Sequence, residues 1–261
     1  ITERSVNFAG TTTWTNAAVG NQGFFYTGSG ATLTNSGVFQ DQTVADTSIN
    51  NGLGGADSVF INTGTYTKSG ASTNNISIAF NNLGTLDVSA GVLNLGGGMS
   101  NLIGTTLTGG AIQVGNSGVL KINGANIVTN ASTLVLDGPG SALLDSGSGT
   151  DALTNFATNT AAGSFTIRNG RDFSTSGGFS NSGVVNIGLG STFNASGGFT
   201  NSSGAQLQIA GGSFTGPGLT NAGLVTGFGS LAAGVSNTGQ VQAAGGVLTL
   251  SGGVQGSTGV V

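Results

Sequence analysis

Charged and chemically reactive side chains are scarce in this 261-residue sequence. It has no cysteine, no histidine and two prolines, and 5% of its residues are charged, whereas ordinary domains carry about 25%. Without histidine or cysteine, Ser–His and Cys–His nucleophiles, thiolate sites and imidazole-bound zinc are excluded. We therefore expect a protein that is not an enzyme and that holds no cofactor.

The scarcity of basic residues also limits the partners. Five scattered Lys and Arg residues cannot form the stripe that neutralises phosphates, so we expect no nucleic-acid partner. No apolar run approaches the ~18–20 residues of a membrane span, so we expect no membrane insertion. The sequence begins at Ile1 without Met or an apolar leader, as a mature secreted chain would, and the lack of cysteine permits secretion. We predict an extracellular location.

Glycine, in contrast, is abundant, and the last third of the chain is repetitive. Of the 261 residues, 51 are glycine. Four consecutive units, each of roughly 20 residues or slightly fewer, open with an apolar residue, then Ser or Thr, then Asn, and reach a glycine soon afterwards. The shared asparagines are Asn181, Asn201, Asn221 and Asn237. The same order of residues recurs less regularly upstream, at Asn35, Asn62, Asn82 and Asn116.

Each repeated asparagine is followed by alternating apolar residues, such as Val185 and Ile187, and this period of two is typical of strands. A unit of roughly 20 residues with short strands and glycine corners is one coil of a parallel β-solenoid, and glycine supplies the positive φ that corners need. We predict an all-β fold: one domain over residues 1–261, with about 13 coils of roughly 20 residues and no substantial helix.

The asparagine column has a structural interpretation. Stacked coils place equivalent residues about 4.8 Å apart, and an Asn side chain carries both a donor and an acceptor. Asn181, Asn201, Asn221 and Asn237 can therefore form a buried amide ladder. The preceding residues, Ser180, Thr200, Thr220 and Ser236, should form an outward column of hydroxyls. Such a column also occurs on ice-binding solenoids, although these usually carry two threonine files.

Two segments carry a family resemblance. One begins at Asn62 and reads Asn-Thr-Gly-Thr-Tyr-Thr-Lys-Ser-Gly, and the other begins at Gly91 and reads Gly-Val-Leu-Asn-Leu-Gly-Gly-Gly. With these segments the chain resembles the β-strand-repeat proteins of bacterial cell surfaces, and it is similar to autotransporter passenger domains and filamentous-haemagglutinin-like adhesins. The resemblance implies a right-handed β-helix, export to the bacterial cell surface, and a role in adhesion, biofilm or appendages.

The two ends of the sequence suggest self-assembly. Residues 1–8 include the alternating Val6 and Phe8 and read as an assembly strand, whereas residues 254–261 read as an incomplete coil with Val254, Val260 and Val261. An uncapped coil offers unpaired backbone groups to another chain, and a head-to-tail contact propagates into a fibre. We predict a head-to-tail homopolymer, a bacterial surface filament. The alternatives are a fragment of a longer solenoid and an adhesin stalk that binds cell-surface glycans.

Three further groups of residues are candidate sites. Asp151 and Asp172, with Arg171, are one coil apart and could form a polysaccharide-cleaving site. The oxygen-rich segment from Asp145 to Asp151 could hold calcium, although it lacks the dense carboxylates of calcium loops. Finally, the aromatic rings that could contact sugars, or instead fill the core, are Trp14, Tyr26 and Tyr66.

Overall fold

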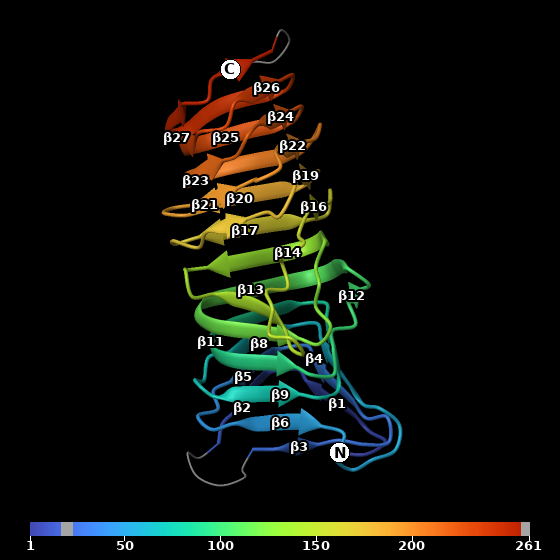
Figure 1. Cartoon of the computed structure of the whole chain (residues 1–261). Coiled ribbons are helices and arrows are strands. Elements are labelled where there is room, and N and C mark those ends of the chain that lie inside the picture. Colours follow the sequence, from blue (N-terminus) through green and yellow to red (C-terminus); the bar gives the residue numbers. More distant parts are fainter. Residues whose placement is uncertain (17–22, 257–261) are drawn as a thin grey trace. The chain divides into compact units, whose positions relative to one another are not determined.

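A computed structural model describes residues 1–16 and 23–256 of the chain (Figure 1). Contacts divide it into two compact units, which are described separately. The first unit comprises Ile1–Gly104, Thr108–Asn126 and Gly140–Ala152, and the second comprises Thr105–Leu107, Ile127–Pro139 and Leu153–Val261. The described residues form strands, turns and bends, and no helix occurs among them.

The first unit is built from short parallel strands. Wholly or mostly within it lie β1 (Ser5–Phe8), β2 (Thr11–Trp14), β3 (Phe25–Tyr26), β4 (Thr32–Asn35), β5 (Val38–Asp41), β6 (Thr47–Asn50), β7 (Val59–Asn62), β8 (Thr65–Lys68), β9 (Thr73–Ile76), β10 (Ala79–Asn82), β11 (Thr85–Leu95), β12 (Leu102–Ile103), β13 (Thr106–Ile122) and β15 (Ala142–Asp145). One sheet has the order β1-β4-β7-β10, and β2, β5, β8 and β11 pair successively in a second sheet. A third wall pairs β3, β6, β9 and β11.

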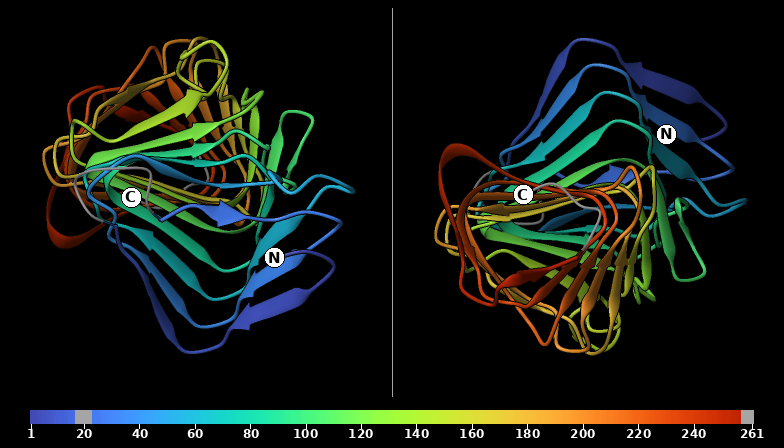
Figure 2. Two further views of the ribbon diagram at one scale, coloured as in Figure 1. Left: turned by 90° about the horizontal axis from the view of Figure 1, so that it is seen from below. Right: turned by 90° about the horizontal axis from the view of Figure 1, so that it is seen from above.

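The second unit repeats this arrangement. Its strands are β14 (Thr129–Asp137), β16 (Thr158–Asn159), β17 (Ser164–Arg168), β18 (Phe173–Ser174), β19 (Phe179–Asn181), β20 (Val184–Gly188), β21 (Thr192–Asn194), β22 (Phe199–Asn201), β23 (Gln206–Thr215), β24 (Leu219–Asn221), β25 (Leu224–Leu231), β26 (Val235–Asn237), β27 (Gln240–Leu250) and β28 (Val254–Gln255). Strands β14, β17, β20, β23, β25 and β27 pair in parallel as one wall. Strands β16, β19, β22, β24, β26 and β28 form another. Seen end-on, the chain of this unit winds from wall to wall (Figure 2).

Alternation along the strands builds the core of each unit. Every second residue points inward, as the buried and partly exposed residues of β8 and β17 show. The parallel register then stacks like residues, so that Phe179 lies over Phe199 with ring centroids 5.3 Å apart in the second unit. In the first unit Phe60 stacks on Phe80 at 5.2 Å. Each interior is therefore a set of apolar columns that run from coil to coil.

One column of glycines is required by close packing rather than by backbone conformation. These glycines stand two residues after a column asparagine, and a Cβ on Gly64 would collide with the carbonyl oxygen of Gly37 in the preceding coil. In the second unit, a Cβ on Gly239 would collide with the carbonyl oxygen of Gly223 in the same way. None of these glycines has a positive φ. The expected left-handed corner glycines do occur, but at other positions, such as Gly190 and Gly204.

The structure confirms the predicted all-β fold with stacked parallel strands. The length of a coil, however, is less uniform than the repeat suggested. Successive column asparagines lie 27 and 20 residues apart in the first unit, and 29, 22, 20, 20 and 16 apart in the second. The coil count and the single domain over residues 1–261 stay predictions.

Candidate functional site

The four column asparagines of the repeat are buried and hydrogen-bonded to one another. The Nδ2 of Asn181 donates to the Oδ1 of Asn201 at 2.9 Å. Asn201 donates in turn to Asn221, and Asn221 to Asn237, each at 2.8 Å. The parallel register places each asparagine directly opposite the next one. Each asparagine points inward, as does the apolar residue two positions before it. The column is a continuous amide ladder.

This ladder is longer than the repeat indicated, and a second one lies in the first unit. Asn130 donates to Asn159, and Asn159 to Asn181, both at 2.9 Å. In the first unit Asn35 donates to Asn62 at 2.7 Å, and Asn62 to Asn82 at 2.8 Å. The ladders thus run on through coils that the regular repeat does not reach.

Three asparagines show the limits of the sequence signal. Asn130 and Asn159 were missed because no glycine follows either of them within three residues, whereas every other ladder member has one. Asn116 has that glycine but is exposed, and its Oδ1 accepts from the Gly140 amide at 2.9 Å. A glycine after asparagine therefore marks most rungs, but it is neither necessary nor sufficient.

The amides of the ladder also hold the backbone. Besides its ladder partner, the Nδ2 of Asn201 donates to the carbonyl oxygen of Leu224 at 3.1 Å. The Nδ2 of Asn62 donates to the carbonyl oxygen of Thr85 at 2.8 Å. Buried amide groups are stable only when they are satisfied, and these bonds use the donors and acceptors that coil stacking provides. The asparagines therefore have a structural role and are not arranged for chemistry.

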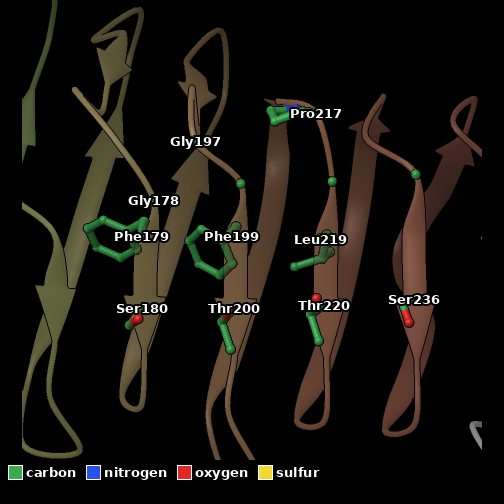
Figure 3. A pocket seen from close by; sticks show the side chains of 13 residues that line it. Gly178, Phe179, Ser180, Gly197, Phe199, Thr200, Pro217, Leu219, Thr220 and Ser236 are labelled. Atoms are coloured by element: carbon green, nitrogen blue, oxygen red, sulfur yellow. The ribbon is translucent and has the colours of Figure 1, made fainter.

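A shallow groove of about 600 Å³ lies outside the ladder in the second unit. Its exposed side carries four register partners, and Figure 3 shows their side chains in a row across neighbouring strands: Ser180, Thr200, Thr220 and Ser236. Glycines and Pro217 form the adjoining rim. Neighbouring residues of the row are separated by the distance between adjacent strands, so the groove presents a regular series of hydroxyl groups along the coil axis.

The predicted assembly residues lie on strands at the edges of the sheets. β1 is the first strand of the sheet β1-β4-β7-β10, and its half-buried Val6 and Phe8 lie opposite Leu33 and Asn35. The ring of Phe8 packs on Phe39 with centroids 5.2 Å apart. Val254 in β28 is half-buried opposite Val235. Val260 and Val261 lie outside the described residues.

The candidate catalytic residues Asp172 and Arg171 make local contacts. Asp151 belongs to the first unit, whereas Asp172 and Arg171 belong to the second. The backbone carbonyl of Asp172 accepts from Arg171, and its Oδ1 accepts from the Thr192 amide at 2.7 Å. Arg168 instead pairs with Asp137, with 2.8 Å between Nη2 and Oδ2. Asp172 and Arg168 are therefore engaged in local contacts.

The segment that was weighed for calcium forms a compact turn. Asp145 Oδ2 accepts from the backbone amide and the hydroxyl of Ser148, both at 2.7 Å, and these bonds lower the pKa of Asp145 to about 2. Its Oδ1 accepts from the Ala125 amide at 3.1 Å. The carboxylate is thus used within the turn. In the part of the chain that the structure describes, no cluster of three or more His, Cys, Asp or Glu residues is present.

Of the three candidate sugar-contacting aromatics, two are inside. Trp14 is buried and its Nε1 donates to the carbonyl oxygen of Gly23 at 2.7 Å, and Tyr66 is fully buried. Tyr26 is 49% exposed and stacks on Phe24 with ring centroids 5.8 Å apart. Tyr26 is therefore the one of the three that can meet a ligand at the surface.

The sequence analysis missed a buried charged cluster in the first unit. Asp41 and Lys68 are both fully buried, face each other across β5 and β8, and lie 3.8 Å apart between Oδ1 and Nζ. Tyr66 donates to Asp41 Oδ2 at 3.0 Å, and Asn74 donates to the same oxygen. Burial lowers the pKa of Lys68, opposed in part by Asp41, and burial followed by Asp41 raises the pKa of Tyr66.

The sequence does contain a signal for this cluster, in the alternation of inward and outward residues along β5 and β8. Lys68 follows Tyr66 by two residues, and Asp41 follows Phe39 by two, so each charged residue lies on the inward face of its strand. An inward charge requires a partner, since an unpaired buried charge is very costly. A search for charged residues on apolar strand faces would have found both.

Comparison with known proteins does not place the chain in a family. It matches no known family profile, no curated protein and no solved structure. Within the described residues, no helix has the length and apolar character needed to cross a membrane.

Proposed function

We propose that this chain is an extracellular structural protein that stacks head to tail as a subunit of a bacterial surface filament or matrix. The observation that carries the proposal is the strand edge of β1, which pairs with β4 on one side and with no second strand in the described residues. Val6 and Phe8 on β1 are half-buried, as is Val254 on β28. A second copy that added its coil there would bury these side chains further and continue the stack of parallel strands.

Three features of the chain suit a structural subunit. The amide ladders and aromatic columns bind each coil to the next along one axis, so the fold can continue through a further copy. Asp145 is held in a turn, and Arg168 forms an ion pair with Asp137. The low charge of the chain, 5% of its residues, leaves little repulsion between copies.

Electron microscopy of negatively stained protein at rising concentration tests the proposal. The intact chain should form filaments, and a variant without residues 1–8 should not. A Phe8→Lys variant should lose filaments too, because a charge would be buried at the joint, whereas Ser5→Lys on the exposed face of the same strand should keep them. Intact chain that remains as single particles at every concentration contradicts the proposal.

A second function, adhesion to cell-surface glycans, is favoured by the hydroxyl groove and by exposed Tyr26. Hydroxyl groups and an exposed aromatic ring suit sugar contacts. A glycan array probed with the intact chain tests it. Saturable binding that falls in a Thr200→Val, Thr220→Val double variant would identify the groove, and binding that falls in Tyr26→Ala would identify the aromatic site.

A further inference from the structure

Lys68 is a nucleophile in an unusual place. Its side chain is fully buried, on β8, in a chain with only one other lysine, Lys121. The Nζ donates to the carbonyl oxygen of Gly70 and to the hydroxyl of Ser72, which lies 3.1 Å away, and Asp41 Oδ1 lies at 3.8 Å. A primary amine is therefore held beside a carboxyl group in an interior that excludes water.

The carboxyl group of Asp41 is held by hydrogen-bond donors on both oxygens. The hydroxyl and the backbone amide of Thr43 donate to Oδ1, at 2.9 Å and 3.3 Å. Tyr66 and Asn74 donate to Oδ2. The two donors on Oδ2 are placed where negative charge develops if a nucleophile adds to the carboxyl carbon, which is the arrangement of an oxyanion hole.

We propose that Lys68 and Asp41 condense to form an intramolecular isopeptide bond that joins β5 to β8. The amine in its neutral form attacks Cγ of the protonated carboxyl group, and the Nζ–Cγ bond forms. The Cγ–Oδ1 bond breaks, and Oδ1 leaves as water with the carboxyl proton and one amine proton. No oxidant, metal or cofactor enters the balance.

The burial of the site favours the reactive form of the amine. Burial lowers the pKa of Lys68, opposed in part by Asp41, and only the uncharged amine is a nucleophile. The strand register holds the two residues opposite each other, so the reaction needs only a small movement of the lysine side chain.

The isopeptide bond would provide a covalent link between coils, which this sequence cannot form through disulfides. The chain has no cysteine, so no disulfide can link its coils. Lys68 and Asp41 are register partners on strands of adjacent coils, and an amide between them would tie those coils covalently.

Tryptic peptide mass spectrometry of the full chain tests the proposal, because trypsin cuts after Arg4, Lys68 and Lys121 in this region. With the bond, peptides 5–68 and 69–121 should remain joined after denaturation and digestion, with the mass of uncut 5–121 less one water. Fragmentation should place the loss on Lys68 and Asp41. Amine acetylation in denaturant should label Lys121 fully and leave Lys68 unlabelled.

Two separate peptides of unchanged mass, with Lys68 fully acetylated, would overturn the proposal. A loss of one ammonia that maps to Asn74 would also overturn it, because Asn74 would then be the acyl donor. In an Asp41→Ala variant the two peptides should separate. The measurement on the unaltered chain does not depend on whether that variant folds.

Discussion

The two units share one device for joining coils and differ in what else they bury. Both contain a ladder of asparagines followed by a column of closely packed glycines. In the described residues of the second unit no charged side chain is buried, whereas the first unit buries Asp41 and Lys68 with Tyr66 and Asn74. The comparison shows which features the fold requires and which are added to it.

Polar residues at the coil corners account for part of the difference. Asp41 lies in the 27-residue coil between Asn35 and Asn62, whereas Lys68 lies in the 20-residue coil between Asn62 and Asn82. The corners of these two coils carry Thr43 and Ser72, whose buried hydroxyls lie 2.6 Å apart and bond to the charged cluster. In the second unit, stacked phenylalanines such as Phe179 and Phe199 fill the interior.

The largest loss of stability is expected when the charged cluster is disrupted. A Lys68→Met change removes the proposed cross-link and also leaves the buried carboxyl group of Asp41 without its partner, and loss of one partner of a buried pair costs about 3–5 kcal/mol. Addition of Asp41→Asn should recover part of the loss, because the amide is uncharged. Urea unfolding measures both. Lys121→Met, on a partly exposed lysine, should change stability little, and an equal loss there would contradict the role of the cluster.

The next largest loss of stability is expected from substitutions in the two ladders, which can be compared directly. Asn62→Ala and Asn201→Ala each remove one rung with ladder bonds on both sides and a bond to a backbone carbonyl. Each change leaves buried partners unsatisfied, at about 1–3 kcal/mol for each group. If both units use the same device, the two losses measured by urea unfolding should agree. A loss confined to one unit would show that the ladders are not equivalent.

A smaller effect tests the glycine column. Gly64→Ala in the first unit and Gly183→Ala in the second would each push a methyl group into a backbone carbonyl of the preceding coil. Overpacking of this kind costs about 1–3 kcal/mol. Gly10→Ala is the matched control, because no atom lies within 4 Å of its added Cβ. The thermal unfolding midpoint should fall for the first two variants and stay unchanged for the control.

The smallest effect is a local titration. The pKa of Asp145 is lowered to about 2 by its bonds to Ser148, so the carboxylate supports its turn above the ordinary value of 3.8. That support is lost as the pH falls through about 2. NMR titration of the Asp145 carboxyl carbon should show the low midpoint, and Ser148→Ala should move it back toward 3.8. An ordinary midpoint in the unaltered chain would contradict the turn geometry.

Part of this architecture could be predicted from the sequence. Alternation after each asparagine identified the strands, and the recurrence of Asn181, Asn201 and Asn221 identified a ladder, because both follow from local spacing. The partnership of Asp41 with Lys68 could not be predicted in the same way, because the coil that contains Asp41 is 27 residues long and therefore does not match the roughly 20-residue repeat. When coils differ in length, the spacing in the sequence does not show which residues of adjacent coils lie opposite each other.

The role of glycine was only half predicted for a similar reason. A turn that needs positive φ can be recognised from the residues of the turn itself, as at Gly190. Gly64 is required by the carbonyl oxygen of Gly37, which belongs to a different coil, so its cause cannot be found in its own segment. Contacts between coils decide such positions.

The asparagine ladder makes the alignment of the coils independent of their length. Successive rungs are joined by bonds of nearly equal length, 2.7 to 2.9 Å, although the chain between them varies from 16 to 29 residues. The segment between two rungs can therefore gain or lose residues while the spacing of the rungs stays the same, so the length of one coil does not dictate the length of the next.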